Sequence, residues 1–230
     1  MEQTTHHTVE AFDAELEELR HRTLSMAETV KSQLQAVGEA LAAADAKRAQ
    51  AVAEGDEAVN AWELSLDAYV EFLLSRRQPQ ASDLRLLIGA LRESVDLERA
   101  GDEIRSAAKG ILHQHGQLSQ EAERIWPSLV KMHALAMSMM DDAIAILKKP
   151  DVSPAYALIG RRSVVRTEMK ALMDAVLEAI SANRITPENG FEMMRIARAF
   201  ERVSAHLQNV GEAVVFVVDG VDVRHEHDLK

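Results

Sequence analysis

Apolar residues recur every three or four positions through most of the chain, which is the spacing of one face of an α-helix. In the first such stretch, Phe12, Leu16 and Leu19 begin a stripe that continues to Leu34. The pattern predicts six long helices separated by short breaks. These helices are expected at residues 9–44, 46–76, 82–112, 119–148, 155–182 and 187–219.

The breaks carry residues that commonly begin or interrupt helices. Asp45 and Ser82 are predicted to cap the second and third helices, because their side chains can accept from free backbone N–H groups. Thr186 followed by Pro187 predicts a cap and first residue for the sixth helix. Gly55 lies inside the second predicted helix, at a cost of about 1 kcal/mol relative to alanine.

Two segments about half the chain apart repeat each other. Residues 97–104 read LERAGDEI, and residues 200–207 read FERVSAHL. Both lie late in long helical patterns, and short connections between the predicted helices favour antiparallel neighbours. The sequence therefore predicts an all-α fold of two tandem antiparallel three-helix bundles, residues 1–115 and 116–230.

Composition narrows the functional classes. Hydrophobic residues make up 47% of the chain but aromatic residues only 4%, which favours packed helices over sheets. The formal net charge of −11 argues against binding to nucleic acid, since duplex-binding proteins present basic surfaces. The absence of cysteine excludes disulfides and thiolate metal sites. The N-terminal segment lacks the apolar core of a secretory signal, so we expect a cytoplasmic protein.

Oxygen-bearing side chains gather on two of the predicted helices. The spacing i, i+4, i+7 in the second helix and i, i+4 in the third places each set on one helix face. If the two faces meet, we expect them to bind a hard or borderline ion such as Mg²⁺, Mn²⁺, iron or Zn²⁺. The predicted metal-binding residues are Asp56, Asn60, Glu63, Glu98 and Asp102.

An ordinary explanation competes with the metal site. Carboxylates four residues apart in an acidic helical protein usually form a solvated face. Arg99 and Arg105 lie within reach of the third-helix acids and can neutralise them as simple ion pairs. Spacing alone favours the solvated face.

Four segments together resemble the PhoU family, the phosphate-transport regulators of bacteria. They are FDAELEELRHRTLSMAETV at the start, EGDEAVNAWELSLD in the second helix, RRQPQASDLRLL before the third, and LERAGDEI. The resemblance implies a pair of three-helix bundles with an acidic residue, three intervening residues and Asp in each repeat. It also implies that some members hold multinuclear metal clusters on these faces, which would match the five residues named above.

The resemblance implies a regulatory adaptor, not an enzyme. Such an adaptor would repress phosphate uptake and the phosphate-starvation response by binding the ATPase of the phosphate ABC transporter and the sensor histidine kinase. Membrane association would then be peripheral, through those partners. Apolar stripes left exposed on the bundles would favour a homodimer. No phosphate-cradling glycine loop, kinase motif set or serine nucleophile elbow occurs in the chain.

Two other classes of function stay open. One is a metal-dependent or metal-storing protein acting through the carboxylates of the first repeat. The other is a structural scaffold that binds unrelated partners through apolar stripes.

The second half departs from the family pattern. Arg162 and Arg166 stand where the acidic run is expected on the fifth helix, with Met169 at a third position, and Ala205 replaces the Asp of the sixth helix. Two arginines repel cations, so the sequence argues against a second metal cluster. The arginines are instead predicted to form ion pairs with Glu201 or Glu168.

Overall fold

The computed structural model describes residues 3–55, 57–114 and 120–224. All regular secondary structure in these ranges is α-helical, which confirms the predicted fold class. The helices are α1 (Gln3–Ala43), α2 (Ala46–Glu54), α3 (Glu57–Arg77), α4 (Ala81–Gln114), α5 (Gln120–Lys148), α6 (Val152–Gly160), α7 (Arg162–Ser181) and α8 (Pro187–Asp219).

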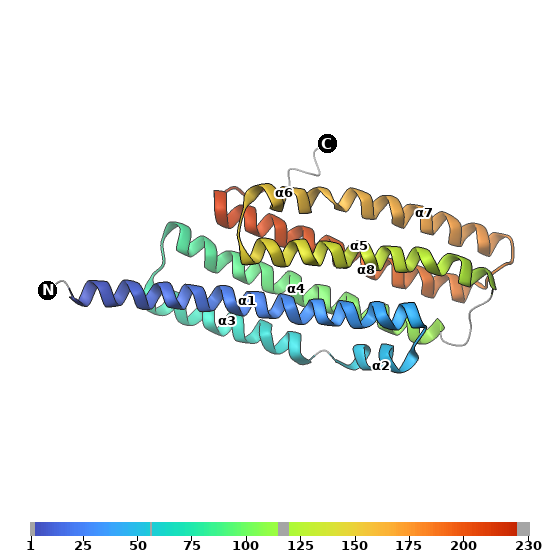
Figure 1. Ribbon diagram of the computed structural model, residues 1–230, viewed down its shortest axis with the longest axis horizontal. Coiled ribbons are helices and arrows are strands. Elements are labelled where there is room, and N and C mark those ends of the chain that lie inside the picture. The colour runs from blue at the N-terminus through green and yellow to red at the C-terminus, as the bar shows by residue number, and fades with distance from the viewer. Residues whose placement is uncertain (1–2, 56, 115–119, 225–230) are drawn as a thin grey trace.

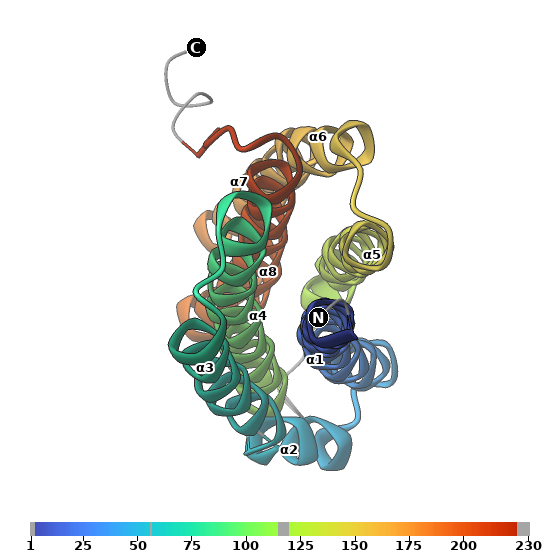
Figure 2. The same cartoon turned by 90° about the vertical axis from the view of Figure 1, so that its left-hand side faces the viewer.

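The helices form two bundles that lie side by side (Figure 1). The first contains α1, α3 and α4 as its long members, and the second contains α5, α7 and α8. Seen along the long axis, α4 lies against α8 and α1 lies against α5 (Figure 2), so buried side chains from both bundles form one continuous core. The predicted domain boundary at residues 115–116 stays a prediction, because residues 115–119 lie outside the described part of the chain.

The second long helix of each bundle is interrupted, so the prediction of one unbroken helix was wrong in both places. In the first bundle, α2 ends at Glu54, and the amide of Gly55 bonds to the carbonyl of Val52. In the second bundle, α6 ends at Gly160 and α7 begins at Arg162. Each break leaves a nine-residue helix ahead of a longer one. The apolar periodicity continues across both breaks, which is why the pattern concealed them.

Two of the three predicted side-chain caps are present. Asp45 accepts hydrogen bonds from the amides of Lys47 and Arg48, and Thr186 accepts from the amide of Asn189, as predicted. The prediction for Ser82 was wrong, because α4 begins one residue earlier and places Ser82 inside its first turn.

The antiparallel pair α4–α8 joins the two bundles at very close range. A Cβ atom added to Gly89 would lie 2.3 Å from a methyl carbon of Val217, and one added to Gly110 would lie 2.6 Å from Cγ1 of Ile196. Both distances are shorter than van der Waals contact. Glycine is therefore required at each of these positions for the helices to approach this closely.

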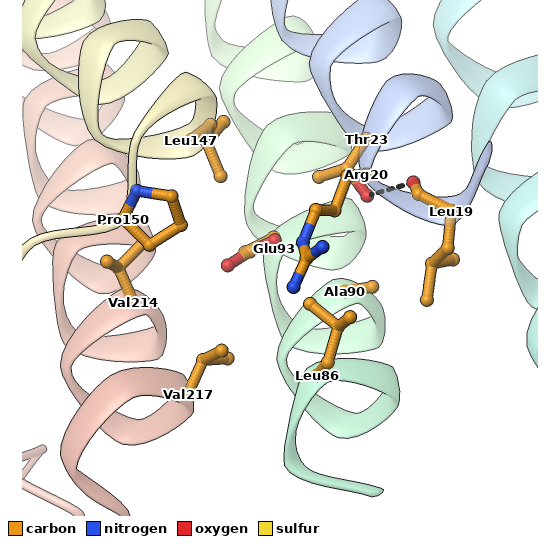
Figure 3. Close-up of a pocket in the computed structure, with 10 residues that line it drawn as sticks. All are labelled: Leu19, Arg20, Thr23, Leu86, Ala90, Glu93, Leu147, Pro150, Val214 and Val217. Atoms are coloured by element: carbon orange, nitrogen blue, oxygen red, sulfur yellow. Dashed lines mark hydrogen bonds between the residues drawn. The ribbon is translucent and has the colours of Figure 1, made fainter. Parts of the chain in front are cut away.

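A small cavity at the junction of the bundles encloses one carboxyl group. It is lined by side chains of α1, α4 and α8, together with Leu147 and Pro150 at the end of α5 (Figure 3). Its volume of about 30 Å³ is near that of a single water molecule. The carboxyl of Glu93 and the guanidinium of Arg20 both extend into it from facing helices (Figure 3). Glu93 is only 6% exposed.

Burial raises the pKa of Glu93 to about 7, because the charged form loses its hydration there. In the unfolded chain the same carboxyl titrates near 4.5. The unfolded state therefore releases this proton at lower pH than the folded state does. Ionised Glu93 destabilises the fold progressively as pH rises from about 4.5 to 7, by up to about 3 kcal/mol.

The close approach of α4 and α8 predicts the effect of Gly110→Ala. The added methyl group overpacks the contact with Ile196, and we expect the free energy of unfolding to fall by about 1–2 kcal/mol despite alanine's better helix propensity. Urea denaturation measures the change. Gly160→Ala is the matched control, because an added Cβ there meets no atom within 4 Å. Equal stability of the two variants would contradict the packing argument.

The buried carboxyl predicts a pH-dependent gain from Glu93→Gln. We expect the variant to be more stable than wild type by about 3 kcal/mol at pH 8, and this advantage to disappear near pH 4.5. Denaturation at a series of pH values measures the difference. Glu71→Gln, at an exposed position of α3, provides the control and should show no such trend. A Glu93→Gln advantage independent of pH would show that Glu93 is not the titrating group.

Candidate functional site

The predicted site lies along the seam between α3 and α4. Asn60 and Glu63 come from α3 and are partly buried. Glu98 from α4 is also partly buried, whereas Asp102 is exposed. The fifth predicted ligand, Asp56, lies outside the described residues. The structure therefore brings four of the five residues to two packed helices.

Electrostatics show that the acidic faces of α3 and α4 meet. The pKa of Glu63 is raised, first by burial and then by the nearby charges of Asp67 and Asp102. Arg99 opposes this shift. Because Asp102 and Arg99 belong to α4, their influence on Glu63 places these groups close together across the seam. A bound cation would relieve the repulsion that Glu63 experiences.

Arginines of α4 already neutralise part of this seam. Arg105 donates to the carboxylate of Asp102 one helical turn away. Among the described residues, no three His, Asp or Glu side chains come close enough together to hold a metal ion. The oxygen atoms of the described side chains are suitable metal ligands, but these side chains do not form a metal site by themselves. The five-residue site, which includes Asp56, stays a prediction.

Gln33 of α1 supports the same region and was not anticipated from the sequence. Its side-chain amide donates to the carbonyl of Gly55 over 2.8 Å, at the break between α2 and α3. Its Oε1 atom is buried without a hydrogen-bond partner among the described atoms and lies 3.5 Å from the Cβ position of Gly101. Gln33 thus fixes the backbone immediately before the predicted ligands. A lone Gln in an amphipathic stripe gives no sequence signal for this role.

The contacts of α7 with α8, the second seam, show that the predicted ion pairs were wrong. Arg162 donates to Oε1 of Gln208 over 3.2 Å, and Glu168 instead pairs with Lys131 at 2.7 Å. No ion pair between either arginine and Glu201 occurs in the described part of the chain. Because α7 runs antiparallel to α8, Arg162 at its start lies opposite Gln208, about two helical turns beyond Glu201. The register of α7 against α8, which spacing within one helix does not reveal, explains the error.

His206 of α8 packs against α4. Its Nδ1 atom lies 2.9 Å from a carboxylate oxygen of Asp96. Asn209 donates to the same oxygen over 2.8 Å. These contacts join α4 to α8 and leave His206 with a structural role.

None of the helices in the described part of the chain is both long and apolar enough to cross a membrane.

Comparison with known proteins gives a consistent result over both halves. The family model described as "PhoU domain" matches residues 23–111 and again 129–214. A relative from Pseudomonas putida, named "Phosphate-specific transport system accessory protein PhoU homolog", is 32% identical over 97% of this chain and 87% of its own length. The "Phosphate-specific transport system accessory protein PhoU" of Escherichia coli strain K12 is 28% identical over 93% of this chain and 88% of its own length.

Solved structures agree with the sequence relatives. The crystal structure of PhoU from Pseudomonas aeruginosa superposes with a TM-score of 0.86 at 28% identity, covering 91% of this chain and all of that one. The phosphate transport system regulatory protein PhoU from Streptococcus pneumoniae gives a TM-score of 0.84 at 26% identity, covering 92% of this chain and 99% of that one. Because the domain model matches both repeats and the similarity extends over nearly the whole chain, the protein belongs to the PhoU family.

Proposed function

We propose that this protein is a regulatory adaptor that represses phosphate uptake and the phosphate-starvation response. Its partners would be the ATPase of the phosphate ABC transporter and the phosphate sensor histidine kinase. The observation that carries the proposal is similarity over nearly the full chain to proteins named accessory proteins of a phosphate-specific transport system. Those relatives are named as accessory proteins and the Streptococcus pneumoniae protein as a regulatory protein, and neither name is that of an enzyme.

The repeated architecture suits an adaptor with two partners. Each bundle places one long helix, α3 or α7, away from the contact between bundles (Figure 1). Both helices expose large apolar side chains, including Leu64 at 70% and Leu177 at 55% exposure. Such residues supply contact area for a partner protein or for a second copy of this chain, so the proposal includes a homodimer. Peripheral attachment to the membrane would follow from the partners.

Regulation by this route requires differential binding. An adaptor can report the state of a transporter only if it binds one conformation of that transporter more tightly than another. The adaptor would then distribute between transporter and kinase according to transport activity. No chemical step by the adaptor itself is needed.

The adaptor function predicts the phenotype of a deletion strain. In high-phosphate medium, loss of this protein should derepress a phosphatase reporter of the starvation response, because the kinase loses its repressing partner. A plasmid copy should restore repression. Reporter activity that stays low in the deletion strain would contradict the proposal.

Binding to purified partners supplies a second measurement. The tagged protein should retain the transporter ATPase and the cytoplasmic part of the sensor kinase on an affinity resin, whereas an unrelated acidic helical bundle should not. Derepression without retention of either partner would place the protein in the phosphate response but remove the adaptor mechanism.

Metal binding at the α3–α4 seam is a second candidate function. It is favoured by the crowding of Glu63 with Asp67 and Asp102, which a divalent or trivalent ion would relieve. Asn60, Glu63, Glu98 and Asp102 would supply oxygen ligands, together with Asp56. Mg²⁺, Mn²⁺, iron and Zn²⁺ all accept such ligands.

The metal-binding candidate predicts a loss of affinity in Glu98→Gln/Asp102→Asn. After removal of metal with a chelator, equilibrium dialysis against Mn²⁺ should show at least tenfold weaker binding by this variant than by wild type. Glu71→Gln/Asp174→Asn removes the same charge from exposed positions on α3 and α7 and is the control. Equal Mn²⁺ binding by all three proteins would eliminate the seam as a metal site.

A further inference from the structure

A polar cavity of about 270 Å³ lies in the second bundle, between the start of α7 and the later part of α8. Three arginines line it: Arg162 and Arg166 from α7, and Arg224 from the segment that follows α8. Gln208 and Glu212 line the opposite side from α8. The net charge of the chain is −11, so a cluster of three arginines stands out against an acidic background.

Two of these arginines have unused hydrogen-bonding capacity. The Nε atom of Arg162 is buried and has no hydrogen-bond partner among the described atoms, while its Nη1 atom donates to Gln208. Arg166 is exposed, and no hydrogen bond or ion pair joins it to any other described residue. A buried guanidinium N–H without a partner is costly, and a bound acceptor would remove that cost.

The acids near the cavity cancel only part of these charges. Glu212 is 4% exposed, and its carboxylate accepts a hydrogen bond from Nε2 of Gln208 over 2.6 Å. Asp222 is already paired with Arg224, with Nε donating to Oδ1 over 2.8 Å. Among the described residues, Arg162 and Arg166 therefore form no ion pair with a carboxylate, and the cavity keeps an excess of positive charge.

We propose that this cavity binds a phosphate group, either as free inorganic phosphate or as the phosphomonoester of a lipid headgroup. A phosphate dianion carries enough charge for two guanidiniums and enough acceptor oxygens to bond Arg162 and Arg166 from different directions. A carboxylate carries only one negative charge, which a single guanidinium already neutralises. The inference goes beyond the proposed adaptor function, which requires no phosphate site on this protein.

Calorimetric titration of the full chain with inorganic phosphate at low ionic strength tests the site. Wild type should bind saturably with a stoichiometry near one. Arg162→Gln/Arg166→Gln should weaken binding at least tenfold, because both guanidiniums from α7 are lost. Lys170→Gln/Arg198→Gln removes the same charge from exposed positions on α7 and α8 and should bind within about twofold of wild type.

A vesicle-binding experiment distinguishes the two sources of the phosphate group. Phosphatidylcholine vesicles with and without phosphatidic acid are sedimented with each protein. Calorimetric binding of phosphate supports a free-anion site, whereas binding only to phosphatidic acid vesicles, lost in Arg162→Gln/Arg166→Gln, supports a lipid headgroup site. If that variant fails to fold, Arg166→Gln alone serves, since no hydrogen bond or ion pair of Arg166 with a described residue is lost.

Two outcomes would overturn the inference: no saturable binding of either ligand by wild type, or an equal loss of binding in the cavity variant and the charge-matched control. Neither outcome bears on the deletion phenotype. Failure of the phosphate site and failure of the adaptor function are therefore separable.

Discussion

The antiparallel contact of α4 with α8 is the constraint on which the rest of the structure depends. It brings the two bundles together at a distance that only glycine permits at Gly89 and Gly110. Polar contacts then fix its register, including the 3.0 Å ion pair between Arg202 and Glu103 and the contact of His206 with Asp96. Because α3 packs on α4 and α7 on α8, both candidate seams are positioned by this central pair.

The repeat conserves backbone architecture while allowing the chemistry of the seams to diverge. Both bundles contain an Asp-capped nine-residue helix, a break and a longer helix, so the positions that follow the break are structurally comparable. In the first bundle those positions offer Asn60 and Glu63, and in the second they offer Arg162 and Arg166. These side chains lie outside the apolar core, where a change of charge costs little packing energy. Two bundles with similar backbones can therefore carry one acidic site and one basic site.

Sequence patterns predicted the long-range organisation better than the local breaks. Period-3.6 apolar stripes and the repeated Glu-Arg segment were sufficient for an all-α, two-bundle fold, and the caps at Asp45 and Thr186 followed from side-chain chemistry. The breaks after Gly55 and Gly160 were missed because an amphipathic stripe continues through a short interruption. The partners of Arg162 and the burial of Glu93 depend on which helices face each other, which a single-helix pattern does not contain.

The segment that follows α8 contacts both the arginine-lined cavity and helix α4. Asp222 pairs with Arg224 beside the arginine cavity and also lies 3.5 Å from Arg92 of α4. Arg92 in turn packs over the ring of Phe216. An anion held in the cavity would compete with Asp222 for Arg224, and so would act on a contact that ties α8 to α4. Because α4 and α8 join the bundles, this contact would give an anion in the cavity a route to the other bundle. Such a route transmits a signal only if two arrangements of the bundles bind the anion with different affinities. The proposed adaptor function has the same requirement, because it depends on different affinities for two states of the transporter.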